Sequence, residues 1–239
     1  MQKVAVVTGS AKGLGRAIAL ALASFGYILV VHYHTSQQEA KKVLGQIRVK
    51  APKSIMIKAD LKSEAGVKKM FEEIFKKLGR VDLLVNNVGN FVFKKFGQTS
   101  NSEFKDIVES NLYSTLFASR AVLPFMRKQK SGKIINIGAV GAERIQLLEK
   151  STPYFLAKTA VYTITKVMAW EEARNGIHVN MISPASLATD IFSSRDFPMG
   201  RSASYDDVVK VLKFLISSEA DYVNGANIEV AGAFIPGIV

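Results

Sequence analysis

The sequence contains no cysteine among its 239 residues. This absence excludes disulfide bonds, thiolate catalysis and cysteine-ligated zinc, and it fits a reducing compartment. Any redox chemistry must therefore come from a bound cofactor, and we expect no metal site.

Long apolar runs are also missing. No segment approaches the roughly 20 uninterrupted apolar residues of a membrane-spanning helix. The first residues, Met1-Gln2-Lys3, lead directly into a strand-like run, without the apolar core or cleavage site of a secretory signal. We therefore expect a soluble, cytoplasmic protein with no membrane partner.

Acidic residues are fewer than basic ones, with 20 Asp and Glu against 32 Lys and Arg and a formal charge of +12. A clustered excess of this kind would indicate nucleic acid as a partner. The lysines from Lys41 to Lys77 instead recur at helical spacing, usually near Glu and without interleaved aromatics. We expect a solvated basic surface and no nucleic-acid partner. A field that attracts anionic cofactors or an acidic carrier protein is the alternative.

Short runs rich in Val and Ile alternate with longer amphipathic stretches. These runs span residues 4–8, 27–33, 54–57, 81–86, 133–137, 177–182 and 227–230. Unbroken apolar runs indicate strands covered on both faces, and the intervening helices indicate parallel crossovers. The prediction is one α/β domain over residues 1–239, a Rossmann-type doubly wound fold with a seven-stranded parallel sheet. Ligands would bind at the carboxyl ends of its strands, and residues 190–204 form a candidate lid.

A glycine-rich turn follows the first run. It reads Thr8-Gly9-Ser10-Ala11-Lys12-Gly13-Leu14-Gly15-Arg16 and opens an Ala/Leu-rich helix expected over residues 14–24. Glycine allows a tight turn and close approach to a pyrophosphate, and a helix N-terminus offers unpaired N–H groups to an anion. This context predicts a dinucleotide site. It would be formed by Gly9, Ser10, Lys12, Gly13, Leu14 and Gly15. The spacing differs from Gly-x-Gly-x-x-Gly, so a plain strand-to-helix turn is the alternative.

Further motifs follow in order along the chain. They are Asp60-Leu61, Asn86-Asn87-Val88-Gly89, Asn111, Tyr154-x-x-x-Lys158, Pro184 with Thr189, and Asn224-Gly225-x-x-x-x-Val230. With the glycine turn, their order and approximate spacing resemble the short-chain dehydrogenases/reductases over essentially the whole chain. The pattern is most like that of the 3-oxoacyl-[acyl-carrier-protein] reductases, with some features similar to pteridine reductases.

The resemblance assigns several of these residues to a cofactor site. Beyond the glycine turn they are Asp60, Leu61, Asn87, Gly89, Tyr154, Lys158, Pro184 and Thr189. By resemblance, Asp60 would bind the adenine amino group, Leu61 would pack on the ring, and Thr189 would hold the nicotinamide carboxamide. Val88 and Ala185 stand where the family usually has Ala and Gly, so the cofactor would pack slightly differently.

The chain lacks an acidic residue just after the second strand, where an NAD site usually binds the ribose 2′-hydroxyl. It reads His32-Tyr33-His34-Thr35-Ser36 there, with no Asp or Glu before Glu39. Lys12 adds a cation that, with His34, Thr35 and Ser36, would hold a 2′-phosphate. The cofactor predicted is NADPH. Helix N-capping is the alternative role of Thr35 and Ser36.

Tyr154 and Lys158 lie four residues apart, and hence on one face of a predicted helix. An ammonium group there can lower the phenol pKa and orient the cofactor ribose. Tyr154 would be the general acid that protonates a carbonyl oxygen as hydride reaches the carbon. Alone, such a pair is also typical of a packed amphipathic helix. By resemblance, Asn111 would kink its helix and hold a water in a proton relay, whereas a plain helix Asn is the alternative.

One catalytic residue of the family is missing. Ala139 stands at the end of the fifth strand, where the family normally carries a substrate-orienting serine. Ser151 and Thr152 lie nearby in sequence, but Thr152-Pro153 fits a helix N-cap followed by Pro at the first helical position. The somewhat long segment 141–150 is another source of a polar group. Its polar residues include Glu143, Arg144, Gln146 and Glu149.

Three hypotheses remain. The first is an NADPH-dependent carbonyl reductase with a small-molecule or acyl-thioester substrate; acyl carrier protein is a candidate partner through Arg127, Lys128 and Arg174. The second is a pteridine-type reductase, suggested by the His32-Tyr33-His34 segment and the missing serine. The third is a non-catalytic NADP-binding protein, against which the joint retention of Tyr154, Lys158 and Asn111 argues.

Substrate choice is expected to depend on residues 92–98, the lid and residues 234–239. The resemblance also implies a homotetramer, built through the two long helices before Lys128 and Arg174 and through the last strand.

Overall fold

The computed structural model describes residues 2–144, 149–187 and 194–234. The strands are β1 (Val4–Val7), β2 (Ile28–Tyr33), β3 (Ile55–Lys58), β4 (Leu83–Asn86), β5 (Gly132–Ile137), β6 (Ile177–Pro184) and β7 (Asn227–Val230). The α-helices are α1 (Gly13–Ser24), α2 (Gln37–Arg48), α3 (Glu64–Leu78), α4 (Asn101–Val108), α5 (Ser114–Gln129), α6 (Thr152–Glu172) and α7 (Tyr205–Ile216). Short 3-10 turns are η1 (Phe96–Gln98), η3 (Ala173–Asn175), η4 (Ser194–Asp196) and η5 (Ser218–Ala220), and η2 (Glu109–Tyr113) is a π-helical turn.

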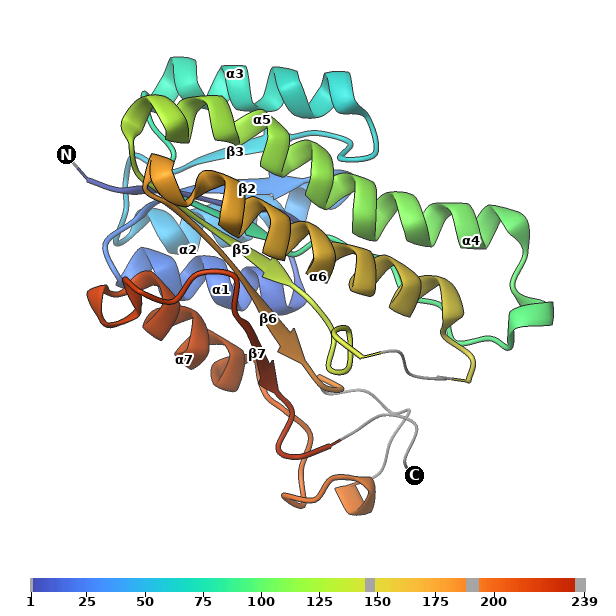
Figure 1. Cartoon of the computed structure of the whole chain (residues 1–239). Coiled ribbons are helices and arrows are strands. Elements are labelled where there is room, and N and C mark those ends of the chain that lie inside the picture. The colour runs from blue at the N-terminus through green and yellow to red at the C-terminus, as the bar shows by residue number, and fades with distance from the viewer. Residues whose placement is uncertain (1, 145–148, 188–193, 235–239) are drawn as a thin grey trace.

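The strands form one parallel sheet in the order β3-β2-β1-β4-β5-β6-β7 (Figure 1). The chain therefore starts at the centre of the sheet, builds outward to β3 and then returns to add β4 on the other side of β1. This reversal creates the crevice between β1 and β4 at which doubly wound sheets bind ligands. The predicted fold class is confirmed, with strand boundaries within two residues of the expected ones.

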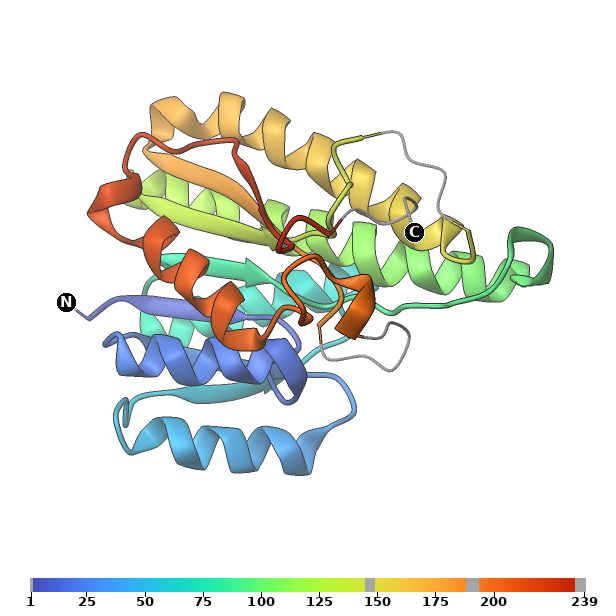
Figure 2. The same ribbon diagram turned by 90° about the horizontal axis from the view of Figure 1, so that it is seen from below.

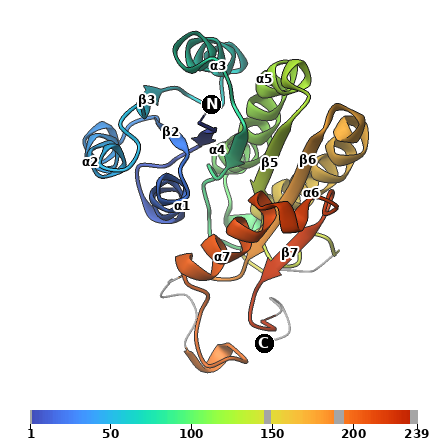
Figure 3. The ribbon, with the colours of Figure 1, turned by 90° about the vertical axis from the view of Figure 1, so that its left-hand side faces the viewer.

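Helices cover both faces of the sheet, as Figure 3 shows along the strands. The helices α1, α2 and α7 pack on one face, and α3, α5 and α6 pack on the other. Successive residues of β1 divide between the two faces, since Ala5 and Val7 contact the first layer while Val4 and Val6 contact the second. Burial on both faces explains why the strands carry unbroken apolar runs.

The described part of the predicted lid lies at the carboxyl end of the sheet, between β6 and α7 (Figure 2). Leu187 pairs with Ala203 in an isolated bridge, and Arg201 forms an ion pair of 2.7 Å with Asp207 in the first turn of α7. Residues 190–193 of the predicted lid lie outside the described residues. None of the described helices is both long and apolar enough to span a membrane.

Candidate active site

The glycine turn between β1 and α1 is fixed by its own backbone geometry. Gly9 and Gly13 have φ values of +63° and +52°, in the left-handed region that favours glycine. A Cβ atom at Gly15 would lie 2.5 Å from the Gly9 carbonyl oxygen and 2.6 Å from Asn87 Nδ2. Lys12 is the N-cap residue of α1 and makes no side-chain capping hydrogen bond. The first-turn amides of α1 are thus suited to bind an anion, as the sequence predicted.

His32 supports this turn from β2. Its Nδ1 accepts a hydrogen bond of 2.9 Å from the Gly9 amide, and its Nε2 lies 3.2 Å from the Ala59 carbonyl oxygen. Burial lowers the pKa of His32 to about 4, so the ring is neutral near pH 7. With Nδ1 accepting, Nε2 carries the proton and donates to Ala59. This role was not predicted, because its only signal in the sequence is a histidine inside an apolar strand.

The side chains of two residues predicted to contact the cofactor, Ser10 and Asn87, form hydrogen bonds to the backbone of the turn and of β2. The buried Ser10 hydroxyl accepts a hydrogen bond of 3.0 Å from the His32 amide. The Asn87 side chain donates 3.0 Å to the Thr8 carbonyl oxygen. These bonds tie the glycine turn to β2 and β4, so both side chains shape the site by positioning its backbone.

The predicted 2′-phosphate site contains an ion pair that the sequence does not reveal. Lys12 Nζ lies 3.0 Å from Glu39 Oε1, and this bond lowers the Glu39 pKa. His34 and Thr35 are exposed after β2. Ser36 is the N-cap residue of α2 but makes no side-chain capping hydrogen bond, so a capping role for its hydroxyl is not borne out.

Asp60 and Leu61 follow β3, at the adenine end of the predicted site. Asp60 Oδ1 accepts a hydrogen bond of 3.0 Å from the Lys62 amide, which stabilises the turn before α3. Leu61 is 4% exposed and packs into the core beneath α3. Its side chain therefore offers little surface for an adenine ring, in contrast to the expected role.

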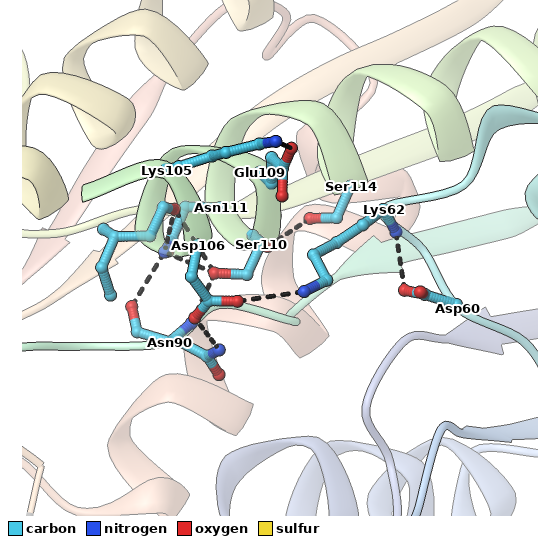
Figure 4. A network of polar contacts seen from close by, with 10 residues as sticks. Asp60, Lys62, Asn90, Lys105, Asp106, Glu109, Ser110, Asn111 and Ser114 are labelled. Atoms are coloured by element: carbon cyan, nitrogen blue, oxygen red, sulfur yellow. Dashed lines mark hydrogen bonds and ion pairs between the residues drawn. The ribbon is translucent and has the colours of Figure 1, made fainter. Parts of the chain in front are cut away.

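Asn111 lies in the π-helical turn η2, so the helix distortion implied by the resemblance is present. Its Nδ2 donates to the carbonyl oxygens of Ile107 (2.9 Å) and Asn90 (2.8 Å), as Figure 4 shows in part. Its Oδ1 is buried and has no hydrogen-bond partner among the described residues. A Cβ atom at Gly89 would lie 2.1 Å from this oxygen. Gly89 thus makes room for a buried acceptor, which a bound donor can satisfy.

A charged clamp holds the loop beside Asn111 (Figure 4). Asp106 Oδ1 lies 3.0 Å from Lys62 Nζ, and its Oδ2 accepts a hydrogen bond of 2.7 Å from Asn90 Nδ2. The Asn90 bond and then the Lys62 bond lower the Asp106 pKa, so this carboxylate is charged at neutral pH. The clamp therefore holds Asn90, whose carbonyl group accepts a hydrogen bond from the Asn111 amide and orients it.

The α6 helix brings Tyr154 and Lys158 to the same end of the sheet. Lys158 is buried, donates 2.8 Å to the Ile137 carbonyl oxygen at the end of β5, and lies 5.4 Å from the centroid of the Tyr154 ring. Burial raises the pKa of Tyr154 to about 12 and lowers the pKa of Lys158 to about 8. The expected lowering of the phenol pKa is therefore wrong for the protein alone, because burial disfavours the charged phenolate.

The same spacing recurs two turns later at Tyr162 and Lys166. Lys166 Nζ lies 5.9 Å from the Tyr162 ring centroid and donates 2.9 Å to the Gly225 carbonyl oxygen before β7. Tyr162 packs against a small apolar cluster with Val161 and Met181. The second pair therefore joins α6 to the last strand, which shows that the spacing alone does not define a catalytic pair.

Ala139 is 5% exposed, so the position of the missing serine is tightly enclosed. On the neighbouring strand β6, the Ser183 hydroxyl donates 2.6 Å to Asn227 Oδ1. Arg144 pairs with Glu229 of β7, and Glu143 accepts a hydrogen bond of 3.1 Å from Asn227 Nδ2.

The segment after Gly141 was expected to offer a replacement polar group. Of its described polar residues, Glu143 and Arg144 are bonded to β7 and Glu149 pairs with Lys95, while Gln146 lies outside the described residues. The predicted N-cap was wrong by one residue, since Ser151 precedes α6 and Pro153 is its second residue. Ser151 is buried but makes no capping hydrogen bond.

The remaining predicted residues are Pro184, Thr189 and the carrier contacts. Pro184 ends β6, and its carbonyl oxygen accepts a hydrogen bond of 3.1 Å from the Val140 amide. Thr189 lies outside the described residues. Arg127, a predicted carrier contact, donates 2.9 Å to the buried Glu172. Within the three described ranges, no cluster of His, Asp and Glu could hold a metal ion.

The chain is similar to known oxidoreductases over almost its whole length. The family model for short chain dehydrogenases matches residues 3–197. The 3-oxoacyl-[acyl-carrier-protein] reductase FabG of Staphylococcus epidermidis is 32% identical, with 97% of this chain and 98% of that protein aligned. The putative oxidoreductase YtkK of Bacillus subtilis is 29% identical, with 95% and 94% aligned.

Two solved structures share the fold closely. Acetoin dehydrogenase YohF from Salmonella typhimurium superimposes with a TM-score of 0.90 at 29% identity, covering 98% of this chain and 96% of that one. A gluconate 5-dehydrogenase from Burkholderia cenocepacia, in complex with NADP and tartrate, has a TM-score of 0.90 at 28% identity, covering 97% and 94%.

Proposed function

The chain belongs to the short-chain dehydrogenase family, and we propose that it is an NADPH-dependent reductase of a carbonyl substrate. The observation that carries this proposal is the arrangement around Asn111 and Lys158. A buried acceptor with no partner among the described residues and a buried amine beside Tyr154 both lie at the carboxyl end of the sheet that also bears the glycine turn. A non-catalytic protein would have no need to keep such costly buried groups.

The site fits a nicotinamide dinucleotide. Gly9 and Gly15 have no space for a side chain, Gly13 has a positive φ, and the N-terminus of α1 favours a pyrophosphate. When bound, the reduced cofactor supplies a hydride to the substrate carbon. The residues of the chain must then supply the proton and hold the reacting groups.

Tyr154 donates the proton in this proposal. Its phenol is protonated at neutral pH because burial raises its pKa to about 12. As negative charge develops on the substrate oxygen, the phenolic proton moves to that oxygen, and the charge passes to the tyrosine. Lys158 in its protonated form stabilises the resulting phenolate, and the Asn111 carbonyl oxygen accepts a hydrogen bond in the path that returns a proton.

The preference for NADPH rests on Lys12, which lies at the end of the glycine turn and can bind a 2′-phosphate. The related gluconate 5-dehydrogenase is described in complex with NADP. Glu39 opposes this preference, because its carboxylate holds Lys12. The cofactor choice therefore depends on whether the phosphate displaces Glu39 from Lys12.

The similarity to 3-oxoacyl-[acyl-carrier-protein] reductases supports an acyl-thioester as one substrate class. A pteridine-type reductase is the second candidate, favoured by Ala139. Reduction of a C=N bond depends less on a hydroxyl that orients a carbonyl oxygen. Cytoplasmic location and acyl carrier protein as a partner remain predictions.

A homotetramer is also proposed, built through α5, α6 and β7. Trp170, on α6, is 86% exposed, and Tyr113, at the start of α5, is 42% exposed. Exposed aromatics of this kind are typical of association surfaces. Light scattering at micromolar concentration tests this assembly, and a strict monomer would contradict it.

The test of the function is NADPH oxidation with acetoacetyl thioesters, diacetyl and dihydropteridines. Turnover of the carbonyl compounds that is lost in Tyr154→Phe would support the first candidate. Turnover of dihydropteridines alone would support the second. Binding of NADPH with no turnover of any substrate would overturn both.

A further inference from the structure

Two phenylalanines are exposed in the segment between β4 and η1. Phe91 is 50% exposed and Phe93 is 45% exposed. Their rings lie at an interplanar angle of 22° with centroids 6.3 Å apart. Large apolar side chains exposed together commonly mark a binding surface.

This aromatic pair adjoins the proposed proton donor. The Phe91 ring meets the Tyr154 ring edge to face, with centroids 5.0 Å apart and an interplanar angle of 89°. A substrate whose oxygen reaches the Tyr154 phenol therefore comes close to Phe91. The rest of that substrate can extend from there along Phe93.

The backbone and charges around the pair hold it in place. The Lys94 amide donates 2.7 Å to the Lys150 carbonyl oxygen, which joins the segment to the approach to α6. Lys150 Nζ lies 5.3 Å from the Phe93 ring centroid, a cation–π contact. Ion pairs Lys94–Glu103 and Lys95–Glu149 fasten the same segment to α4 and to the residue before Lys150.

We propose that Phe91 and Phe93 form a wall that selects planar, conjugated carbonyl substrates. A flat ring system can contact both phenylalanines while its oxygen lies at Tyr154. A small aliphatic carbonyl compound is too short to reach both rings, so it gains no such contact. The inference rests on the proposed reductase function and adds to it a substrate class.

The test compares two α-diketones that share the reacting group but differ in shape. Phenanthrene-9,10-quinone is planar and conjugated, and diacetyl is small and aliphatic. The variant Phe91→Leu/Phe93→Leu keeps apolar side chains but removes both rings. Phe214→Leu is the matched control, because Phe214 is a phenylalanine of α7 that is 38% exposed and lies outside the residues proposed to bind cofactor or substrate.

With NADPH, the double variant should lose about tenfold in kcat/KM for the quinone, mainly through KM, because each aromatic contact contributes several-fold in affinity. Diacetyl reduction should change less than about threefold, and Phe214→Leu should leave the reduction of both substrates unchanged. Equal losses of kcat/KM for the two diketones, or no loss for the quinone, would contradict the proposed selection by Phe91 and Phe93.

A binding measurement separates this inference from the reductase function. Calorimetric titration of 2-naphthol is carried out with and without NADPH, in the wild type and in the double variant. Binding that weakens about tenfold in the double variant would support the wall even if no carbonyl compound were reduced. Equal binding of 2-naphthol to both proteins would reject the proposed role of Phe91 and Phe93. The proposed NADPH-dependent reductase function would still stand if diacetyl were reduced.

Discussion

The ammonium group of Lys12 and the carboxylate of Glu39 lie 3.0 Å apart, joining the N-cap of α1 to the first turn of α2. The Lys12 side chain is 63% exposed and the Glu39 side chain is 42% exposed, so solvent weakens the pair. A 2′-phosphate carries more charge than a carboxylate and can compete for Lys12. Glu39 would then lower the affinity for NADPH without abolishing it.

The first prediction concerns this pair. Glu39→Gln should tighten NADPH binding by about twofold to fivefold, because Lys12 is released and a repelling charge is removed. Lys12→Glu should abolish the preference for NADPH over NADH. Dissociation constants for both cofactors, measured by fluorescence titration at constant ionic strength, test both variants. A wild type that binds the two cofactors equally would contradict the assignment.

The second prediction uses the repeated Tyr-x-x-x-Lys spacing of α6. Tyr154→Phe should lower kcat by about 100-fold or more, since it removes the proposed proton donor. NADPH binding should remain nearly intact. Tyr162→Phe is the matched control, because Tyr162 also lies beside a lysine four residues later. Equal losses in the two variants would indicate a structural role, and undiminished activity of Tyr154→Phe would place the proton donor elsewhere.

The third prediction follows from the buried amine of Lys158. Burial lowers its pKa from 10.5 to about 8, so the folded protein binds its proton more weakly than the unfolded chain does. The wild type should therefore gain stability relative to Lys158→Met as pH rises from 8 towards 10.5. The gain should reach about 2 kcal/mol between pH 7.5 and 9.5.

Urea unfolding of both proteins at these two pH values measures the difference. A difference that stays constant with pH would show that Lys158 titrates normally in the folded state. The comparison reports the titration of Lys158, because all other titratable residues are the same in the two proteins.

The fourth prediction concerns the clamp that positions Asn111. Asp106→Asn removes the charge that binds Lys62, so the Asn90 carbonyl group should hold the Asn111 amide less firmly. We expect kcat to fall by about threefold to tenfold, as for a misplaced catalytic group, with KM for NADPH unchanged. Glu73→Gln, which breaks an exposed ion pair on α3, is the control. A parallel change in KM, or the same loss in the control, would argue for a general loss of structure.

The fold could be predicted from the sequence because central strands such as β1 and β4 are nearly continuous apolar runs. Strands buried on both faces, such as β1, need apolar residues at every position, and this pattern is visible without coordinates. The glycine turn was also predictable, since positive φ at Gly9 and Gly13 demands that residue type.

Other features depend on contacts that no local pattern reveals. The pairing of Lys12 with Glu39 needs the packing of α1 beside α2, and the inward orientation of Ser10 needs its neighbour on β2. The pKa of Tyr154 depends on burial, which the spacing to Lys158 does not report. The contact between Phe91 and Tyr154 joins residues far apart in the sequence.

The fifth prediction concerns the missing serine at Ala139. Ala139→Ser adds a donor beside the developing oxyanion, and such a donor contributes on the order of 3 kcal/mol in other active sites. Because Ala139 is enclosed, only part of this effect is expected, and diacetyl reduction should rise by about threefold to tenfold.

The buried Ser151 hydroxyl is the rival donor for the same role, since it makes no capping hydrogen bond. If Ser151 already filled the role, Ser151→Ala would lower diacetyl reduction and Ala139→Ser would leave it unchanged. We expect the opposite result, with Ser151→Ala close to wild type. Dihydropteridine reduction should stay flat or fall in Ala139→Ser, because a C=N bond does not need the hydroxyl and the added atom crowds the ring. A fall in diacetyl reduction in Ala139→Ser would reject the view that Ala139 marks a simple loss of a catalytic donor.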